Sequence, residues 1–433
     1  MEARMKNRIK RGAGCVCFLG LTTLMLYGTS KLLESKKAVV KYNEFYDCDT
    51  DIDVIFMGTS HMYNSLLPQE LWDEYGITSY NWGYSNCTLP EDYYILQDIV
   101  KEHKPKVVVV DIFGLFEYEK YVNGKYRDDR IEQQHVQFDM IPPSLNKYRA
   151  MNDVFGPYEG KWDFMFDFLM YHNRWEKLKE PDFEPEYSTE KGAEYLKGVG
   201  DDAEYYRAQD FEQLEFNTVC AGYIQPIADF CSENDIELLY VFNPCLTNVE
   251  NINAAYSLDS YMEEKGLAYY NALYLEEISS VTDFCSDSDH LNYSGAVKYT
   301  RRMGDVLKEQ YGIEDHRGEE GYASWDESYA RYLEYKILTI QETENVHDVL
   351  MLSADDDFKV NLQFDPSCSF ALEDTRFVAL VQNLGSSIEV IPVNDLKYEE
   401  NSCQILITVM NSETGEIVAQ QGYAVGDDGP ARL

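Results

Sequence analysis

Two places in the chain carry residue types that together could activate a hydroxyl group. Ser60 follows the apolar run 54–57 and Gly58, while Asp287 and His290 lie three positions apart in a polar stretch far along the sequence. A serine hydroxyl is a weak nucleophile until a base takes its proton, and that base needs an acid to fix its tautomer. We therefore predict nucleophilic catalysis with Ser60 as nucleophile, His290 as base and Asp287 as orienting acid.

Neighbouring residues leave two alternatives open. Asp289 directly precedes His290, but adjacent side chains tend to diverge, so it is the weaker candidate for the orienting acid. His61 directly follows Ser60, and its ring has difficulty turning back onto that hydroxyl, so we expect a local structural role. A metal site of His61, His290 and an aspartate is the competing interpretation. We predict neither a metal nor a cofactor.

The elements that must position these residues alternate between strand and helix. Strands are expected at 53–58, 77–83, 106–113, 236–242 and 268–270, and helices from 66, over 90–103, 212–233 and 253–265, and after 295. Apolar runs without alternation are typical of parallel strands covered on both faces. The sequence thus predicts an α/β domain over 51–312 with a parallel sheet. Chemistry collects at the carboxyl ends of such strands, where Ser60 is expected.

A long interruption from about 115 to 215 follows the third expected strand and is rich in aromatic residues. Because it leaves the sheet edge at which Ser60 is expected, we predict a cap over the site. Within it, His172, Arg174 and Trp175 are candidate substrate-binding residues. A histidine in an aromatic segment is also typical of a purely structural role.

The pattern changes after a linker at 313–334. Apolar-rich runs at 335–340, 348–353, 358–364, 376–381, 387–392, 403–410 and 416–425 are separated by turn-forming residues. Seven short strands without helices predict a small all-β, sandwich-like accessory domain over 335–433. Its expected role is structural packing, with binding of a glycan or a protein partner as the alternative.

One segment near the N-terminus is apolar enough to cross a membrane. No charge occurs between Arg11 and Lys31, a length that spans a hydrocarbon core of roughly 30 Å. We expect a transmembrane anchor at 12–32, a basic cytoplasmic tail at 1–11, a connector at 33–50 and an extracellular body, because positive flanks stay inside. A cleaved signal peptide is the competing interpretation.

The charge of the body argues against anionic partners. Residues 1–37 hold eight Lys/Arg and two Glu, a net of +6, while the whole chain carries −40, so the remainder carries −46. Such acidity argues against nucleic acid and against an anionic bilayer surface. The ten cysteines show no zinc-type spacing, and we assign no disulfide among them.

Three short motifs, in order, resemble the blocks of the SGNH/GDSL hydrolase superfamily. They are Gly58–Ser60, Asn81–Gly83 and Asp287–His290. The surrounding stretches 79–85 and 290–295 resemble membrane-anchored extracytoplasmic SGNH-like proteins of Gram-positive bacteria, relatives of teichoic-acid D-alanylation and exopolysaccharide O-acetylation proteins. The resemblance covers about residues 50–312 apart from much of the cap. It implies a three-layer α/β/α fold and acyl-ester chemistry by a Ser-His-Asp triad.

The resemblance also implies an oxyanion hole that includes the backbone N–H groups of Ser60 and Gly83. The family's asparagine after the third strand is missing, because that position reads Asp111–Phe116 without an asparagine. We rank Asn86 ahead of Asn81 and Asn243 as the substitute, since it lies just beyond Gly83.

Together these observations predict a membrane-anchored serine esterase or O-acyltransferase acting on acyl esters of a cell-envelope glycan or related polymer. The alternative is a catalytically degenerate SGNH-like envelope protein that binds glycan or an assembly partner. Retention of Ser60, Asp287 and His290 favours the first interpretation. The altered third block and the extra domain favour the second. Hydrolysis and transfer share one nucleophile and are not distinguished by the sequence.

Overall fold

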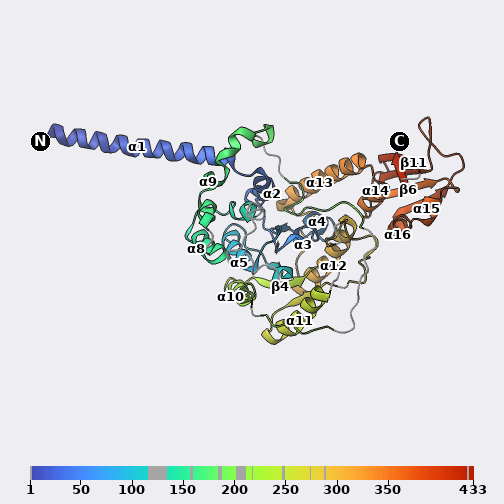
Figure 1. Ribbon diagram of the computed structural model, residues 1–433, viewed down its shortest axis with the longest axis horizontal. Helices are drawn as coiled ribbons and strands as arrows, with labels where there is room; N and C mark the ends of the chain where they lie inside the picture. Colours follow the sequence, from blue (N-terminus) through green and yellow to red (C-terminus); the bar gives the residue numbers. More distant parts are fainter. Residues whose placement is uncertain are drawn as a thin grey trace.

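The structure is a computed structural model that describes residues 2–115, 134–156, 159–183, 188–200, 211–216, 218–245, 249–273, 275–286, 289–426 and 429–433. The chain forms a projecting N-terminal helix, a central α/β domain and a C-terminal region built around a second sheet (Figure 1).

The central sheet is parallel throughout and has the strand order β2-β1-β3-β4-β5. Its strands are β1 (Val54–Met57), β2 (Ser79–Asn81), β3 (Val107–Asp111), β4 (Glu237–Phe242) and β5 (Tyr269–Asn271). The chain passes from β1 to β2 on one side and then crosses to β3 on the other. Ligand sites in open α/β sheets lie at such a reversal, at the carboxyl ends of the strands. Ser60 follows β1 at this point.

Both faces of the sheet are covered by helices. Residues of β1 alternate between two cores, since Ile55 and Met57 belong to one and Val54 and Phe56 to the other. The first core is closed by α5 (Leu89–Ile99), α10 (Ile224–Glu233) and α11 (Val249–Lys265), and the second by α4 (Pro68–Tyr75) and α12 (Tyr293–Tyr311). This arrangement confirms the predicted three-layer α/β/α fold.

One expected helix is shorter than predicted. The sequence predicted a helix over 212–233, whereas α10 begins only at Ile224, after the short turn η5 (Ala221–Tyr223). The N–H of Glu212 donates to Asn253 Oδ1 at 2.9 Å and that of Leu214 to Ser257 Oγ at 2.8 Å. These backbone groups are satisfied by side chains of α11 and therefore do not enter a helix of their own.

The C-terminal region contains a separate sheet, as predicted, with the order β12-β11-β10-β6-β7. Its strands are β6 (Phe358–Phe364), β7 (Ile388–Pro392), β10 (Ile405–Asn411), β11 (Ile417–Gly426) and β12 (Gly429–Arg432), with a small β8 (Lys397–Tyr398) and β9 (Asn401–Ser402) hairpin beside them. All pairs in the larger sheet are antiparallel except β6 with β7.

Three of the seven strands predicted in this region are helices, and the expectation of an all-β sandwich is wrong in that respect. The runs 335–340, 348–353 and 376–381 fall in α13 (Ala323–Glu342), α14 (Val346–Leu352) and α16 (Thr375–Asn383), and a further short helix is α15 (Ser369–Glu373). These helices share one core with β6 and β10. The region is therefore a mixed sheet backed by helices.

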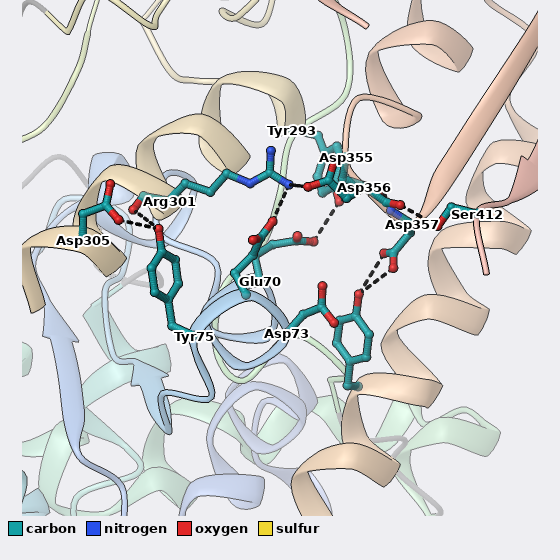
Figure 2. Close-up of polar contacts among 12 residues, drawn as sticks. Glu70, Asp73, Tyr75, Tyr293, Arg301, Asp305, Asp355, Asp356, Asp357 and Ser412 are labelled. Carbon is teal, nitrogen blue, oxygen red and sulfur yellow. Dashed lines mark hydrogen bonds and ion pairs between the residues drawn. The ribbon is translucent and has the colours of Figure 1, made fainter. Parts of the chain in front are cut away.

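A buried charged cluster joins the two sheet regions. Lys336 of α13 is fully buried and donates to Asp355 Oδ2 at 2.8 Å and to Asp357 Oδ2 at 2.5 Å. Its ammonium also lies 3.6 Å from Glu70 of α4. Figure 2 shows acidic groups of α4 and of the loop after α14 gathered around Tyr293 and α12. The C-terminal region is thus fixed to the α/β domain by a polar junction.

The N-terminal helix α1 (Glu2–Leu33) projects from the body (Figure 1). Its stretch Lys10–Leu33 is long and apolar enough to cross a membrane, and the most apolar 18 residues within it are not buried by the described part of the chain. This composition is compatible with a single-pass anchor or a signal sequence. The next helix, α2 (Lys36–Asp47), packs Tyr42 and Phe45 into the first core beside Trp82.

The described parts of the 115–215 interruption have two different structures and lie in two different places. Residues 134–183 form α8 (Leu145–Phe155), η2 (Glu159–Met165), α9 (Asp167–Tyr171), η3 (His172–Lys177) and η4 (Glu180–Asp182). Here α8 packs on α5, while α9 and η3 pack against α1. Residues 188–200 instead run without regular structure toward the carboxyl edge of the sheet. Residues 116–133 and 201–210 lie outside the described part, so the cap over Ser60 stays a prediction.

Candidate active site

A tight turn after β1 delivers Ser60. Gly58 has φ +133°, a conformation that side chains rarely adopt, and a Cβ there would lie 2.5 Å from Asp111 Cβ. Only glycine lets β1 turn this close to β3. Thr59 then caps the short helix α3 (Ser60–Tyr63) by accepting the N–H of His61. Ser60 therefore begins a helix at the sheet edge, half-buried.

Asp111 at the end of β3 holds the turn in place. Its Oδ2 accepts the Thr59 hydroxyl at 2.5 Å and the Thr59 N–H at 3.3 Å, and its Oδ1 accepts the N–H of Phe113 at 2.9 Å. Burial raises the pKa of Asp111, although the nearby His61 and these hydrogen bonds act in the opposite direction. This role of Asp111 was not predicted, and its only signal in the sequence is an acid that ends an otherwise apolar strand.

The structure brings Ser60 and His290 together across a separation of 230 residues. His290 Nε2 lies 2.8 Å from Ser60 Oγ, which is hydrogen-bonding distance. Both side chains are half-buried and so remain within reach of a substrate. A base at this distance from a serine hydroxyl meets the geometric requirement for proton transfer.

The loop that carries His290 is fixed on both sides. Phe284 and Leu291 form an antiparallel bridge, and the N–H of Cys285 donates to the carbonyl of His290 at 2.9 Å. Asn292 caps α12 by accepting the N–H of Gly295, and its side-chain amide donates to the carbonyl of Thr282 at 2.8 Å. His290 is therefore held by the helix cap and the bridge together.

Residues 188–200, part of the predicted cap, connect the loops that carry the candidate site residues. The carbonyl of Lys191 accepts the N–H of Asn81 in β2. The N–H of Glu194 donates to Tyr63 at the end of α3, and that of Gly200 donates to Phe284 in the histidine loop. One extended segment thus connects the ends of the Ser60 turn, the second strand and the His290 loop.

The predicted orienting acid, Asp287, lies outside the described residues, and its role stays a prediction. Asp289 pairs with His61, with 3.5 Å between its Oδ2 and His61 Nε2. His61 is 2% exposed, and its ring stacks on that of His290 with 4.5 Å between centroids. This placement agrees with the local structural role expected for His61.

His61, Asp289 and His290 are also the described residues that could hold a metal ion, because one ligand atom of each lies within 4.8 Å of the others. The Nε2 atom of His290 already faces the Ser60 hydroxyl at 2.8 Å. That contact matches proton transfer, and the expectation of no metal stays a prediction.

One of the expected oxyanion donors, the N–H of Gly83, is already engaged in a hydrogen bond within the protein. The N–H of Gly83 donates to Asn81 Oδ1 at 2.9 Å, and the Asn81 amide donates in turn to the carbonyls of Met62 and Leu66. In this arrangement Gly83 serves to shape its own loop. Its role as a donor to an oxyanion stays a prediction that requires this hydrogen bond to open. Ser60, the other predicted backbone donor, is the first residue of α3.

The two other asparagines considered as donors differ in setting. Asn86 has φ +59°, a left-handed conformation that asparagine tolerates, and its carbonyl accepts from Gln134. Asn243 follows β4 and is fully buried, with its Oδ1 accepting the Tyr299 hydroxyl at 2.8 Å. Asn86 lies in the loop after β2, the strand that pairs with β1. It remains the predicted substitute for the missing oxyanion-hole asparagine.

The three candidate substrate-binding residues of the insertion lie beside the N-terminal helix instead of the catalytic edge. Arg174 donates to the carbonyls of Leu33 and Glu34 at the end of α1 and to Asp182 at 2.6 Å. His172 contacts the carbonyl of Leu169, and Trp175 is exposed on η3. Figure 1 shows α9 next to the end of α1 and α3 nearer the centre of the body. The sequence offered no signal for this placement, because the partner of Arg174 is the end of the N-terminal helix α1.

No family model and no curated protein matches the chain. Among solved structures, a candidate lipolytic protein of the G-D-S-L family from Desulfitobacterium hafniense DCB-2 matches 59% of this chain and 100% of its own, at 12% identity and a TM-score of 0.29. A candidate acylhydrolase from Bacteroides fragilis NCTC 9343 matches 61% of this chain and 88% of its own, at 10% identity and a TM-score of 0.30. Likeness at these scores carries no weight for function, which rests on the geometry of Ser60 and His290.

Proposed function

We propose that the chain is a membrane-anchored, extracytoplasmic serine esterase or O-acyltransferase. The observation that carries this proposal is the 2.8 Å contact between Ser60 Oγ and His290 Nε2 at the carboxyl edge of a parallel sheet. A serine and a histidine so placed are the two groups that acyl transfer through a covalent intermediate requires.

The chemistry runs in two steps. Ser60 Oγ attacks the carbonyl carbon of an ester while His290 Nε2 accepts the hydroxyl proton, and the imidazolium then gives that proton to the departing alcohol. An acyl group is left on Ser60. In the second step His290 takes a proton from either water or an acceptor hydroxyl, whose oxygen attacks the acyl carbon. The bond between this carbon and Ser60 Oγ breaks, and His290 returns the proton to Ser60 Oγ. Asp287 is proposed to orient the imidazole.

The proposed substrate is an acyl ester of a cell-envelope glycan or related polymer. The apolar stretch Lys10–Leu33 supports an uncleaved anchor, and the basic residues before it support an N-terminus in the cytoplasm and a body outside. The net charge of −46 after residue 37 disfavours polyanions such as nucleic acid, so an uncharged or weakly charged glycan suits this body better.

A cavity near the histidine loop supports a polymeric substrate. It has a volume of about 500 Å³ and is lined by Gly198 and Ser286 from the α/β domain and by His347, Asp374 and Arg376 from the C-terminal region. Ser286 lies four residues before His290, so a chain that places its ester at Ser60 has a polar cavity close by. This gives the C-terminal region a proposed role in glycan binding.

A second candidate function is favoured by one specific observation. The N–H of Gly83 is engaged by Asn81, and the position after β3 lacks the expected asparagine. Both facts suit a protein that keeps the fold for binding a glycan or an assembly partner without turnover.

The two functions are separated by following the acyl group. The full-length protein in detergent is incubated with an O-acetylated glycan, with and without an unacetylated acceptor glycan, and free acetate and acetylated acceptor are measured. We expect either product to form with the wild type and not with Ser60→Ala. Binding of the glycan with no product from a folded wild type would support the second function and contradict the first.

A further inference from the structure

Exposed apolar side chains are found on the elements at the end of the body from which α1 projects. We call residues 145–156 and 159–183 the collar. Seven of its large apolar side chains are between 44% and 65% exposed, namely Leu145, Tyr148, Trp162, Phe166, Leu169, Trp175 and Phe183. The other three of the five tryptophans, Trp72, Trp82 and Trp325, are buried. Water-exposed indole rings are thus found in the collar alone.

The collar is attached directly to the end of α1. Both α9 and η3 pack against α1, and Arg174 donates to the carbonyls of Leu33 and Glu34 where α1 ends. Arg174 also binds Asp182, whose burial works against ionisation but whose hydrogen bonds from Lys179 and Arg174 hold its pKa below the ordinary value. The collar is therefore held at the outer end of the apolar stretch.

The orientation of the collar follows from the direction of α1. Figure 1 shows α8 and α9 at the end of the body from which α1 projects. A bilayer crossed by Lys10–Leu33 would meet this end of the body first. The exposed side chains of α8, η2, α9 and η3 consequently lie on the elements nearest to the lipid headgroups.

The charge of the collar differs from that of the remaining body. It carries six Lys/Arg and seven Asp/Glu, which is nearly neutral, whereas the chain after residue 37 carries −46. A nearly neutral surface avoids the repulsion that an acidic body meets at a membrane. Tryptophan and other amphipathic rings are enriched at membrane interfaces, where one part of the ring is apolar and another hydrated.

We propose that the collar is a second membrane contact, in which its exposed aromatic and aliphatic side chains enter the headgroup region of the outer leaflet around α1. The partner is the lipid surface itself, selected by apolar burial and not by lipid charge. The proposal rests on α1 being a retained anchor, as in the proposed function, and is independent of catalysis at Ser60. Its consequence is a body held in a fixed orientation on the membrane.

Tryptophan fluorescence tests this contact because α1 contains no tryptophan. The full-length protein is reconstituted into phosphatidylcholine vesicles whose acyl chains are brominated either near the headgroup or near the chain end. We expect bromine to quench the emission of Trp162 and Trp175, more strongly from the position near the headgroup. The matched control is Trp162→Phe/Trp175→Phe, which keeps the three buried tryptophans and should not be quenched.

Flotation of the vesicles distinguishes a protein that lacks only the collar contact from one that also lacks the membrane anchor. A wild type that floats with the vesicles but is quenched no more than the double variant overturns the collar contact and leaves the anchor intact. A blue-shifted emission without quenching, as burial against a second protein molecule would give, overturns it equally. A protein that does not float removes the anchor and the collar contact together.

Discussion

At the scale of single residues, the chemistry depends on which of two stacked imidazoles faces the serine. His290 places Nε2 at 2.8 Å from Ser60 Oγ. His61 lies behind it, between the rings of His290 and Phe113, with centroid distances of 4.5 and 3.8 Å. We therefore propose that His290 transfers the proton and that His61 supports its ring.

Replacing each histidine by phenylalanine tests this assignment. His290→Phe removes the base and should lower kcat by about 10²- to 10⁴-fold. His61→Phe keeps an aromatic ring between His290 and Phe113 and should lower kcat by less than about tenfold. The measurement is ester turnover by the two purified variants and the wild type. Comparable losses in both variants, or a larger loss in His61→Phe, would contradict the assignment.

Residues of the candidate site could be predicted from the sequence only where the residue type itself indicates a chemical role. Ser60 and His290 were found because serine beyond a strand-ending glycine and histidine in a polar turn are chemically conspicuous. The placement of Arg174 depends on carbonyls that become available where α1 ends, and the engagement of Gly83 depends on the rotamer of Asn81. Neither follows from residue type or spacing.

At the scale of elements, α2 couples the N-terminal helix to the loop after β2. Lys41 of α2 is 8% exposed and donates to the carbonyl of Gly83 at 2.6 Å. Its ammonium lies 4.1 Å from the centre of the Tyr63 ring. Burial lowers the pKa of Lys41 to about 7 against an ordinary value of 10.5. The helix α2 thus holds the loop after β2 through a titratable group, Lys41.

The pH dependence of stability reports on this contact. Between about pH 7 and 10.5 the unfolded chain binds a proton at Lys41 that the folded protein does not, so the free energy of unfolding should rise with pH across this window. Lys41→Met should lose this rise. Denaturant unfolding at several pH values measures it, with the exposed Lys101→Met as control. An unchanged pH profile in Lys41→Met would refute this role.

Helices and strands could be predicted where the hydrophobic pattern and the length of the apolar run indicated the same kind of element. The apolar runs 54–57 and 107–110 are short, uncharged and rich in valine and isoleucine, and they form β1 and most of β3. The run 335–340 is also short and rich in apolar residues, although it contains Lys336. It continues a helix whose buried residues Tyr332, Lys336 and Ile340 recur every four positions. A short apolar run alone does not distinguish a strand from a buried turn of helix.

At the scale of the whole molecule, two sheet regions meet at a polar junction. Lys336 is the cation at its centre, facing Asp355, Asp357 and Glu70. These carboxylates hold the pKa of Lys336 well above its ordinary value even though burial opposes its charge. Figure 2 shows the acidic groups of the junction approaching from α4 on one side and from the loop after α14 on the other. The lysine therefore offsets repulsion between the two regions.

Lys336→Met should destabilise the protein by about 3–5 kcal/mol, because it leaves buried carboxylates without their counterion. The matched control is Arg302→Met, which removes an exposed ion pair with Glu277 and should cost less than about 1 kcal/mol. Denaturant unfolding of the detergent-solubilised chain gives both values. Equal effects of the two substitutions would show that the junction does not depend on Lys336.

The central claim for the whole molecule is that Ser60 is an activated nucleophile. The most direct measurement is covalent labelling of the folded full-length protein by a fluorophosphonate probe, followed by peptide mapping. We predict a single adduct on Ser60, absent from Ser60→Ala and strongly reduced in His290→Phe. A folded wild type that remains unlabelled, or labelling that persists in Ser60→Ala, would contradict the claim.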